Sequence, residues 1–208
     1  MNRATRRAFD QAAAALIAEF ERTGPFPDQE VTPPVLAEVI RACLETCRQV
    51  DAGELELPLE EIDELGSSAL ECLLDMALWI AKQGGEITVL EPAVNALARE
   101  ADRTRDAAAL EALFARACSL IAQVAPAITE SSDLADLQPW LTLHFNSAII
   151  ATRTQQPDLM NAAYDLLENH IPEHCRAFYA EGVRESSKPA YGAHVGTMMR
   201  ERLAKWTA

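Results

Sequence analysis

The second half of the chain repeats one pattern, in which apolar residues return every three or four positions within segments divided by prolines. Leu110, Leu113 and Leu120, for example, fall on one face of a helix. Pro157 and Pro172 each stand where a new helix can open, because the first turn does not need the missing N–H group. The pattern predicts helices over about 105–125, 134–154, 157–171, 172–185 and 189–206.

The first half carries further helical patterns and one exception. Apolar stripes predict helices over about 3–22 and 33–49, and a central helix from about Ser67 to Gln83 that is apolar nearly all round. A period-2 alternation at 54–59 and the β-prone run "EITVL" at 86–90 flank that central helix. A strand, a helix and a second strand in this order predict a small βαβ element.

We therefore expect a mainly α protein, built as an antiparallel helical bundle or a short α-solenoid, because short links favour antiparallel neighbours. Its N-terminal half, 1–100, is either helical with irregular connections or contains the βαβ element at 54–90. Its C-terminal half, 101–208, is an antiparallel helical bundle.

Charge is concentrated in one stretch of the chain. The net charge is −14, and residues 51–100 hold 12 acidic but 2 basic residues. No basic stripe is present to neutralise phosphates, so nucleic acid and anionic membrane surfaces are excluded as expected partners. The acidic residues of this stretch either form a solvated face that keeps the chain soluble or attract a protein with a basic surface. The residues that would form such a partner surface are Glu54, Glu56, Glu60, Glu61, Asp63 and Glu64.

Five cysteines occur, an odd number, and four of them lie within apolar helical patterns. Buried free thiols fit that distribution better than a disulfide framework, and they indicate a reducing, cytoplasmic location. No apolar run approaches the roughly 18 residues of a membrane-spanning helix.

The stretch 35–100 resembles the STAS domain of anti-sigma-factor antagonists. The shared features are a helix, a strand, a turn reading Gly66-Ser67-Ser68-Ala69, a helix, a Gly-Gly turn, a second strand and Pro92. In that family the first Ser of the turn is a phosphorylation switch, so the resemblance implies Ser67 as acceptor, with Ser68 beside it. Independently of the family, both serines are candidate N-caps, at a helix end that attracts phosphate.

The segment 140–171 is similar to a tetratricopeptide unit. Ala148 occupies a position where a small residue allows close helix contact, and Tyr164 falls at an aromatic position sixteen residues later. Pro172 then ends the unit.

Two further sets of residues have alternative interpretations. In "HIPEHC", His170, His174 and Cys175 could bind a metal ion or serve an enzyme, although Pro172 interrupts the helical spacing. The last two predicted helices carry six large side chains that either pack in the core or form a groove for a partner helix. They are Phe178, Tyr179, Tyr191, Met198, Met199 and Trp206.

No nucleotide-binding or nucleophile-elbow motif occurs in the sequence, and no Glu-x-x-His pair of the kind found in di-iron bundles. We expect a non-catalytic protein-interaction or regulatory protein of the cytosol, without a cofactor. Self-association of the chain is compatible with this expectation. The alternatives are a STAS-like phospho-switch that uses Ser67, and a metal-binding protein or enzyme that uses His170, His174 and Cys175.

Overall fold

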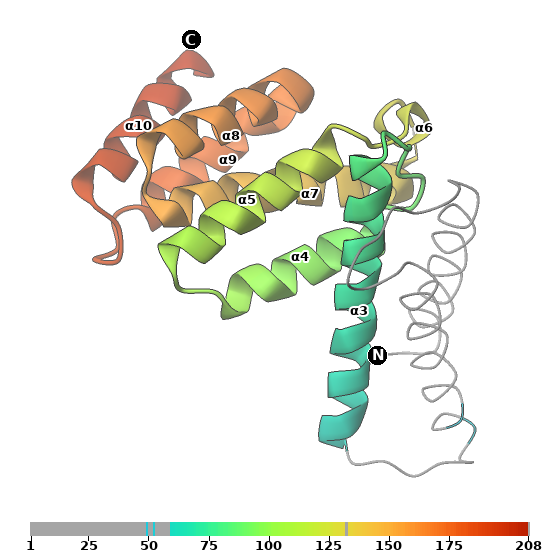
Figure 1. The fold of residues 1–208 in the computed structure, drawn as a ribbon. Coiled ribbons are helices and arrows are strands. Elements are labelled where there is room, and N and C mark those ends of the chain that lie inside the picture. The colour runs from blue at the N-terminus through green and yellow to red at the C-terminus, as the bar shows by residue number, and fades with distance from the viewer. Residues whose placement is uncertain (1–48, 50–51, 53–58, 132, 208) are drawn as a thin grey trace. The chain divides into compact units, whose positions relative to one another are not determined.

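The fold is taken from a computed structural model that describes residues 49, 52, 59–131 and 133–207. Helices dominate this part of the chain (Figure 1). They are α3 (Leu59–Lys82), α4 (Glu91–Arg103), α5 (Ala107–Ile121), α6 (Pro126–Thr129), α7 (Leu134–Thr154), α8 (Pro157–His170), α9 (Pro172–Glu185) and α10 (Ala193–Lys205). The prediction of a mainly α protein is confirmed. The helices predicted at 3–22 and 33–49 lie outside the described residues.

The chain divides into two compact units. The first runs up to Arg99 and takes in Ser119–Pro139, and the second comprises Glu100–Cys118 and Trp140–Ala208.

In the first unit, α3 begins earlier than predicted. The helix starts at Leu59, so Ser67 and Ser68 lie in its interior and do not cap its N-terminus. The expected N-cap role of these serines is wrong. The reason is visible in the sequence, because the acidic run 60–64 is the composition that favours the first turns of a helix. The predicted strand at 54–59 lies outside the described residues except for Leu59, which is helical.

The C-terminus of α3 follows its prediction. Gly84 has φ +73°, in the left-handed region that glycine adopts at little cost. The N–H of Gly85 donates to the carbonyl of Ile80 at 3.0 Å, and the N–H of Gly84 donates to that of Ala81 at 3.0 Å. These two bonds form a Schellman motif, which satisfies carbonyls that the ending helix leaves open.

The predicted second strand at 86–90 does not form. Ile87 forms an isolated parallel β-bridge with Val124. The N–H of Ile87 donates to the carbonyl of Gln123 at 2.7 Å, and the N–H of Ala125 donates to the carbonyl of Ile87 at 3.0 Å. Both segments are too short to extend the pairing, because α4 begins at Glu91 and α6 begins at Pro126. Residues 86–90 therefore form part of the connection between α3 and α4, and they belong to no βαβ element within the described residues.

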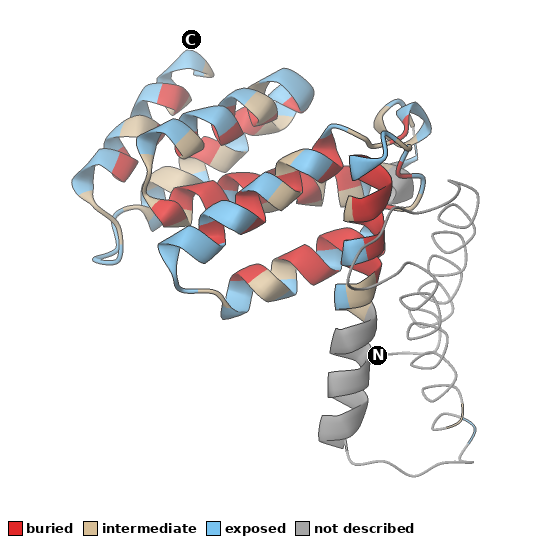
Figure 2. Ribbon diagram, viewed as in Figure 1, coloured by how far each residue is buried: buried red, intermediate tan, exposed pale blue. Residues whose placement is uncertain are grey.

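Apolar side chains that the sequence assigned to the core are buried in both units. Leu73, Leu74 and Ile80 of α3 are fully buried, as expected for a helix that is apolar nearly all round. Leu110 and Leu113 are 2% exposed on one face of α5. Figure 2 shows buried and exposed positions alternating along α5, α8 and α9, as in amphipathic helices.

Local signals set the helix ends of the second unit. Asp106 caps α5, since its Oδ2 accepts from the N–H of Ala109 at 2.8 Å. Pro157 and Pro172 occupy the first positions of α8 and α9, as predicted. Arg153 of α7 donates to the carbonyls of Ala101 and Thr104, where α4 ends.

Within the described part of the chain, no helix is both long and apolar enough to cross a membrane.

Candidate binding groove along helix α9

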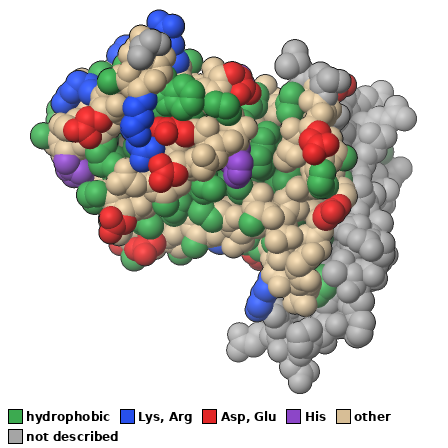
Figure 3. All heavy atoms as spheres, turned by 90° about the horizontal axis from the view of Figure 1, so that it is seen from above, with side chains coloured by type: hydrophobic (Ala, Val, Ile, Leu, Met, Phe, Trp, Pro, Cys, Tyr) green, Lys and Arg blue, Asp and Glu red, His purple; other side chains and the backbone are tan. Residues whose placement is uncertain are grey.

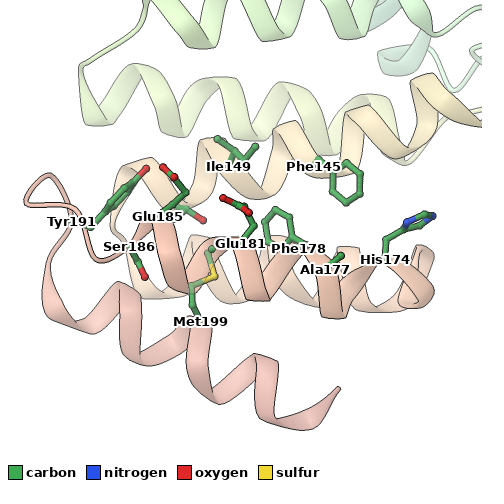
Figure 4. A pocket seen from close by; sticks show the side chains of 12 residues that line it. Phe145, Ile149, His174, Ala177, Phe178, Glu181, Glu185, Ser186, Tyr191 and Met199 are labelled. Atoms are coloured by element: carbon green, nitrogen blue, oxygen red, sulfur yellow. The ribbon is translucent and has the colours of Figure 1, made fainter. Parts of the chain in front are cut away.

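A groove of about 500 Å³ lies in the second unit, between α7, α9, the loop before α10 and the middle of α10 (Figure 4). We call it the α9 groove. Its lining is mostly apolar and aromatic, with a small number of polar groups, which is the usual composition of a binding site of this size. The lining residues are Phe145, Ile149, Thr152, His174, Ala177, Phe178, Glu181, Gly182, Glu185, Ser186, Tyr191 and Met199.

The groove is elongated because it follows one face of α9. The lining positions on this helix run from His174 to Ser186 at helical spacing, and α7 contributes Phe145, Ile149 and Thr152 at intervals of four and three. At 1.5 Å per residue, the α9 face extends over about 18 Å, or somewhat more than three helical turns. Such a trough matches the length of a short docked helix.

One end of the groove is aromatic. The rings of Phe145 and Phe178 stack with centroids 5.9 Å apart and planes 6° from parallel. His174 meets the ring of Phe145 edge-on at 6.0 Å. In Figure 4 this end lies at the right, away from Glu185 and Tyr191.

The wall next to these rings is apolar and partly open to solvent. Ile149 is 47% exposed, and it is the one large hydrophobic side chain in the exposed class among the described residues. Ala177 is also exposed. An apolar side chain left accessible inside a groove is more informative than one scattered on a convex surface, because a ligand can cover it.

The other end of the groove is acidic and polar. Glu181 and Glu185 lie one helical turn apart on α9, and Ser186 and Tyr191 complete this end. Of the residues that line the groove, none is Lys or Arg. The lining therefore carries two carboxylates without a permanent cation inside the groove.

The floor depends on close contact between α9 and α10. A Cβ atom added to Gly182 would lie 2.6 Å from Sδ of Met199, well inside van der Waals contact. Glycine at this position lets the Met199 side chain lie against the α9 backbone. Met199 is 3% exposed and flexible in shape, so it provides an adaptable apolar floor.

Gln155 positions the loop that carries Tyr191. The backbone of Gln155 has φ +56°. Its side-chain Oε1 accepts from the N–H of Gly192 at 2.7 Å, and its Nε2 donates to the carbonyl of Ala190 at 3.1 Å. Nε2 of His194 lies 2.9 Å from the carbonyl oxygen of Gln155. The turn between α7 and α8 is thus fastened to the loop between α9 and α10, which closes the polar end of the groove.

A polar network built around Arg202 lies beneath the groove. Arg202 of α10 donates to Asp165 at 2.6 Å and to Asn161 at 2.9 Å, and its Nη1 lies 3.0 Å from Glu168 of α8. Tyr179 of α9 donates to the same Glu168 oxygen atom at 2.8 Å. One guanidinium therefore connects α8, α9 and α10.

The network continues to the groove wall through Tyr164. The guanidinium carbon of Arg202 lies 5.7 Å from the Tyr164 ring centroid, within reach of a cation–π interaction. The Tyr164 hydroxyl lies 2.8 Å from Oγ1 of Thr152, a lining residue of α7. Polar contacts therefore connect α7, α9 and α10, which line the groove, with α8.

The two tyrosines of this network are held in their neutral form. Burial raises the pKa of Tyr164 to about 12, although its hydrogen bond with Thr152 acts in the opposite direction. Burial also raises the pKa of Tyr179, and its hydrogen bond to Glu168 adds to that effect. Both hydroxyls thus remain available as hydrogen-bond donors at neutral pH.

The residues of "HIPEHC" do not converge on one site. His170 lies at the surface against His144, with ring centroids 4.9 Å apart, whereas His174 lines the groove. Cys175 is buried and its thiol lies 3.7 Å from the carbonyl oxygen of Ile171. Burial raises the pKa of this thiol to about 12, which disfavours the thiolate that a metal ion needs. No group of three or more His, Cys, Asp or Glu side chains in the described chain is arranged to hold a metal ion.

His144 is buried, and its ring contacts those of the buried Trp140 and the exposed His170. It is 1% exposed, its ring centroid lies 4.2 Å from that of Trp140, and its Nε2 has no hydrogen-bond partner in the described structure. Burial, with a smaller contribution from His170, lowers the pKa of His144 to about 3. His144 is therefore a residue of the core.

The residues predicted from charge and from the STAS resemblance belong, where they are described, to the first unit. Ser67 and Ser68 are within α3, as are the backbones of Glu60, Glu61, Asp63 and Glu64. Glu54 and Glu56 are outside the described residues. Phosphorylation of Ser67 and an acidic partner surface at these positions stay predictions. On the face that Figure 3 shows, acidic and basic side chains are interspersed among hydrophobic ones.

Sequence reasoning identified part of the groove. Of the large side chains named on the last two predicted helices, Phe178, Tyr191 and Met199 line it, whereas Tyr179 is buried in the core. The contribution of α7 was missed. Phe145 and Ile149 share a helical face with Thr152, but that spacing is the same as for a buried stripe, so the sequence contains no signal that Ile149 is accessible.

The chain was compared with protein-family models, with curated proteins and with solved structures, and none of the three comparisons found a match.

Replacing Arg202 by methionine is expected to lower the free energy of unfolding by about 2–4 kcal/mol, because Glu168 then keeps a poorly solvated carboxylate without its cation. Urea denaturation measures the change. Arg200, exposed on the same helix, is the matched control, and Arg200→Met is expected to cost less than about 0.5 kcal/mol. Equal effects of the two substitutions would contradict the role given to Arg202.

Acid is expected to destabilise the protein through His144. Its folded pKa of about 3 lies below the ordinary value of 6.5, so the unfolded chain binds the proton first as pH falls. The stabilisation is complete above pH 6.5 and declines toward pH 3. Between pH 7 and 4.5 the loss from this residue is roughly 2–3 kcal/mol.

Urea denaturation at the two pH values tests this expectation. His144→Leu should reduce the loss of stability between them by roughly 2–3 kcal/mol relative to the unmodified chain. The exposed residue His194 provides the control substitution, His194→Leu. An unchanged pH dependence in His144→Leu is the result that would refute the assignment.

Proposed function

We propose that this chain is a non-catalytic protein-interaction or regulatory protein that receives an apolar helix of its partner in the α9 groove. The observation that carries the proposal is a partly exposed Ile149 within a mostly apolar groove about 18 Å long. Amphipathic helices bind proteins by laying apolar residues into grooves of this kind.

The shape of the groove favours a helix over a compact ligand. Both walls are helix faces, and the lining positions continue along α9 from His174 to Ser186. A partner helix lying along them would place residues spaced by three and four positions against Phe178, Ile149 and Met199. Stacked aromatic rings and a methionine floor also suit side chains of several shapes.

The supporting scaffold is already organised without a partner. The Arg202 network fixes α8, α9 and α10, and Gln155 holds the loop at the polar end. A groove that is organised before binding avoids part of the ordering cost of association. This favours recognition of a mobile partner segment by a comparatively rigid receptor.

Photo-crosslinking in the cells that produce the chain tests the proposal. A benzoylphenylalanine residue placed at position 149 is expected to form a discrete adduct with one partner protein. The same residue at position 162, an exposed alanine of α8 outside the groove, is the matched control and should give little of that adduct.

A blocking variant makes the test specific for the groove. Ala177→Trp fills an exposed part of the groove and should abolish the adduct from position 149, whereas Ala204→Trp on exposed α10 surface should not. Unchanged urea midpoints show that both variants fold. An adduct that persists in Ala177→Trp, or that forms equally from position 162, would overturn the proposed function.

A further inference from the structure

The charge of the α9 groove lies at one end, and this asymmetry narrows the class of partner. We infer that the occupant is a basic amphipathic helix, whose apolar or aromatic anchor binds near Phe178 and whose Lys or Arg residues reach Glu181 and Glu185. This inference rests on the proposed function and specifies the partner of the same groove.

The separation of the two ends sets the spacing within the partner. Phe178 and Glu185 are seven residues apart on α9, which corresponds to about 10 Å along the helix axis. A helix lying along α9 spans that distance in two turns. The basic residues should therefore follow or precede the apolar anchor by about seven positions.

The carboxylates of Glu181 and Glu185 can exchange their ion pairs within α9 and the loop after it for ion pairs with a bound helix. Glu181 pairs with Arg184 and Glu185 pairs with Lys188, but all four side chains are about half exposed or more. Exposed ion pairs one turn apart contribute little to stability, because both ions remain well hydrated. Arg184 and Lys188 lie outside the lining, whereas a partner's cation would reach the carboxylates from inside the groove.

Charge complementarity favours a basic helix over an acidic helix as the occupant of the groove. The groove contains two carboxylates and no Lys or Arg, so an acidic segment would bring like charges together as the site loses water. The whole chain carries a net charge of −14, which repels an acidic partner at long range and attracts a basic one.

Two synthetic helical peptides test the inference with the full chain. Each is about 18 residues long and carries the same apolar stripe with one aromatic anchor, and one has lysines about two turns from that anchor where the other has glutamates. Fluorescence anisotropy should show that the lysine peptide binds at least about fivefold more tightly at low salt. Added salt should reduce that preference.

Substitutions assign the preference to the groove. Glu181→Gln combined with Glu185→Gln should weaken binding of the lysine peptide about three- to tenfold and remove most of the discrimination. Glu130→Gln combined with Glu201→Gln changes the net charge equally at exposed positions outside the groove, and it should change the affinity less than about twofold.

The outcomes distinguish this inference from the proposed function. Equal binding of both peptides that Ala177→Trp abolishes would overturn the basic partner but support the groove as a helix receptor. Equal losses in the two glutamine pairs would also overturn the inference, because they would show an effect of net charge alone. Absence of binding by both peptides overturns the basic-helix inference, whereas the crosslinking result at position 149 decides the proposed function.

Discussion

The buried guanidinium of Arg202 is the interaction on which the second unit depends. The Arg202 side chain carries a full positive charge although it is 11% exposed. Ion pairs with Asp165 and Glu168 and a hydrogen bond to Asn161 offset the cost of removing this charge from water. The planar guanidinium of Arg202 donates hydrogen bonds in fixed directions, so it defines the orientation of α10 against α8 more tightly than apolar contact alone would. Tyr179 and Tyr164 then extend this order to α9 and α7.

The groove follows from how these helices are held. α7 and α9 each turn an apolar face toward the trough, but the aromatic pair Phe145–Phe178 fills only one end of it. Close approach at Gly182 brings Met199 under the α9 backbone and completes the floor. Ile149 consequently keeps an accessible apolar surface, which is stabilised when another apolar side chain covers it. The contacts that stabilise the unit therefore also shape the groove.

Sequence patterns predicted the helices well where they carry explicit end signals. Pro157, Pro172 and Gly84 mark helix ends in the structure as they do in the sequence. The predicted start of α3, at about Ser67, was wrong. The alternation around Leu57 is typical of a strand, and the prediction gave it more weight than the acidic run that follows and favours a helix start. The groove was predictable in part, from its aromatic and methionine residues. The exposure of Ile149 depends on how far apart α7 and α9 lie, and a stripe of apolar residues contains no such distance.

The most direct test of the groove as a helix receptor is an NMR measurement of intermolecular contacts. The full chain, labelled at its methionine and isoleucine methyl groups, would be mixed with the unlabelled lysine-bearing helix. We expect nuclear Overhauser effects from the peptide to the methyl groups of both Ile149, on the α7 side of the groove, and Met199, on its floor. Contacts confined to methyl groups outside the groove, or none at a saturating peptide concentration, would contradict it.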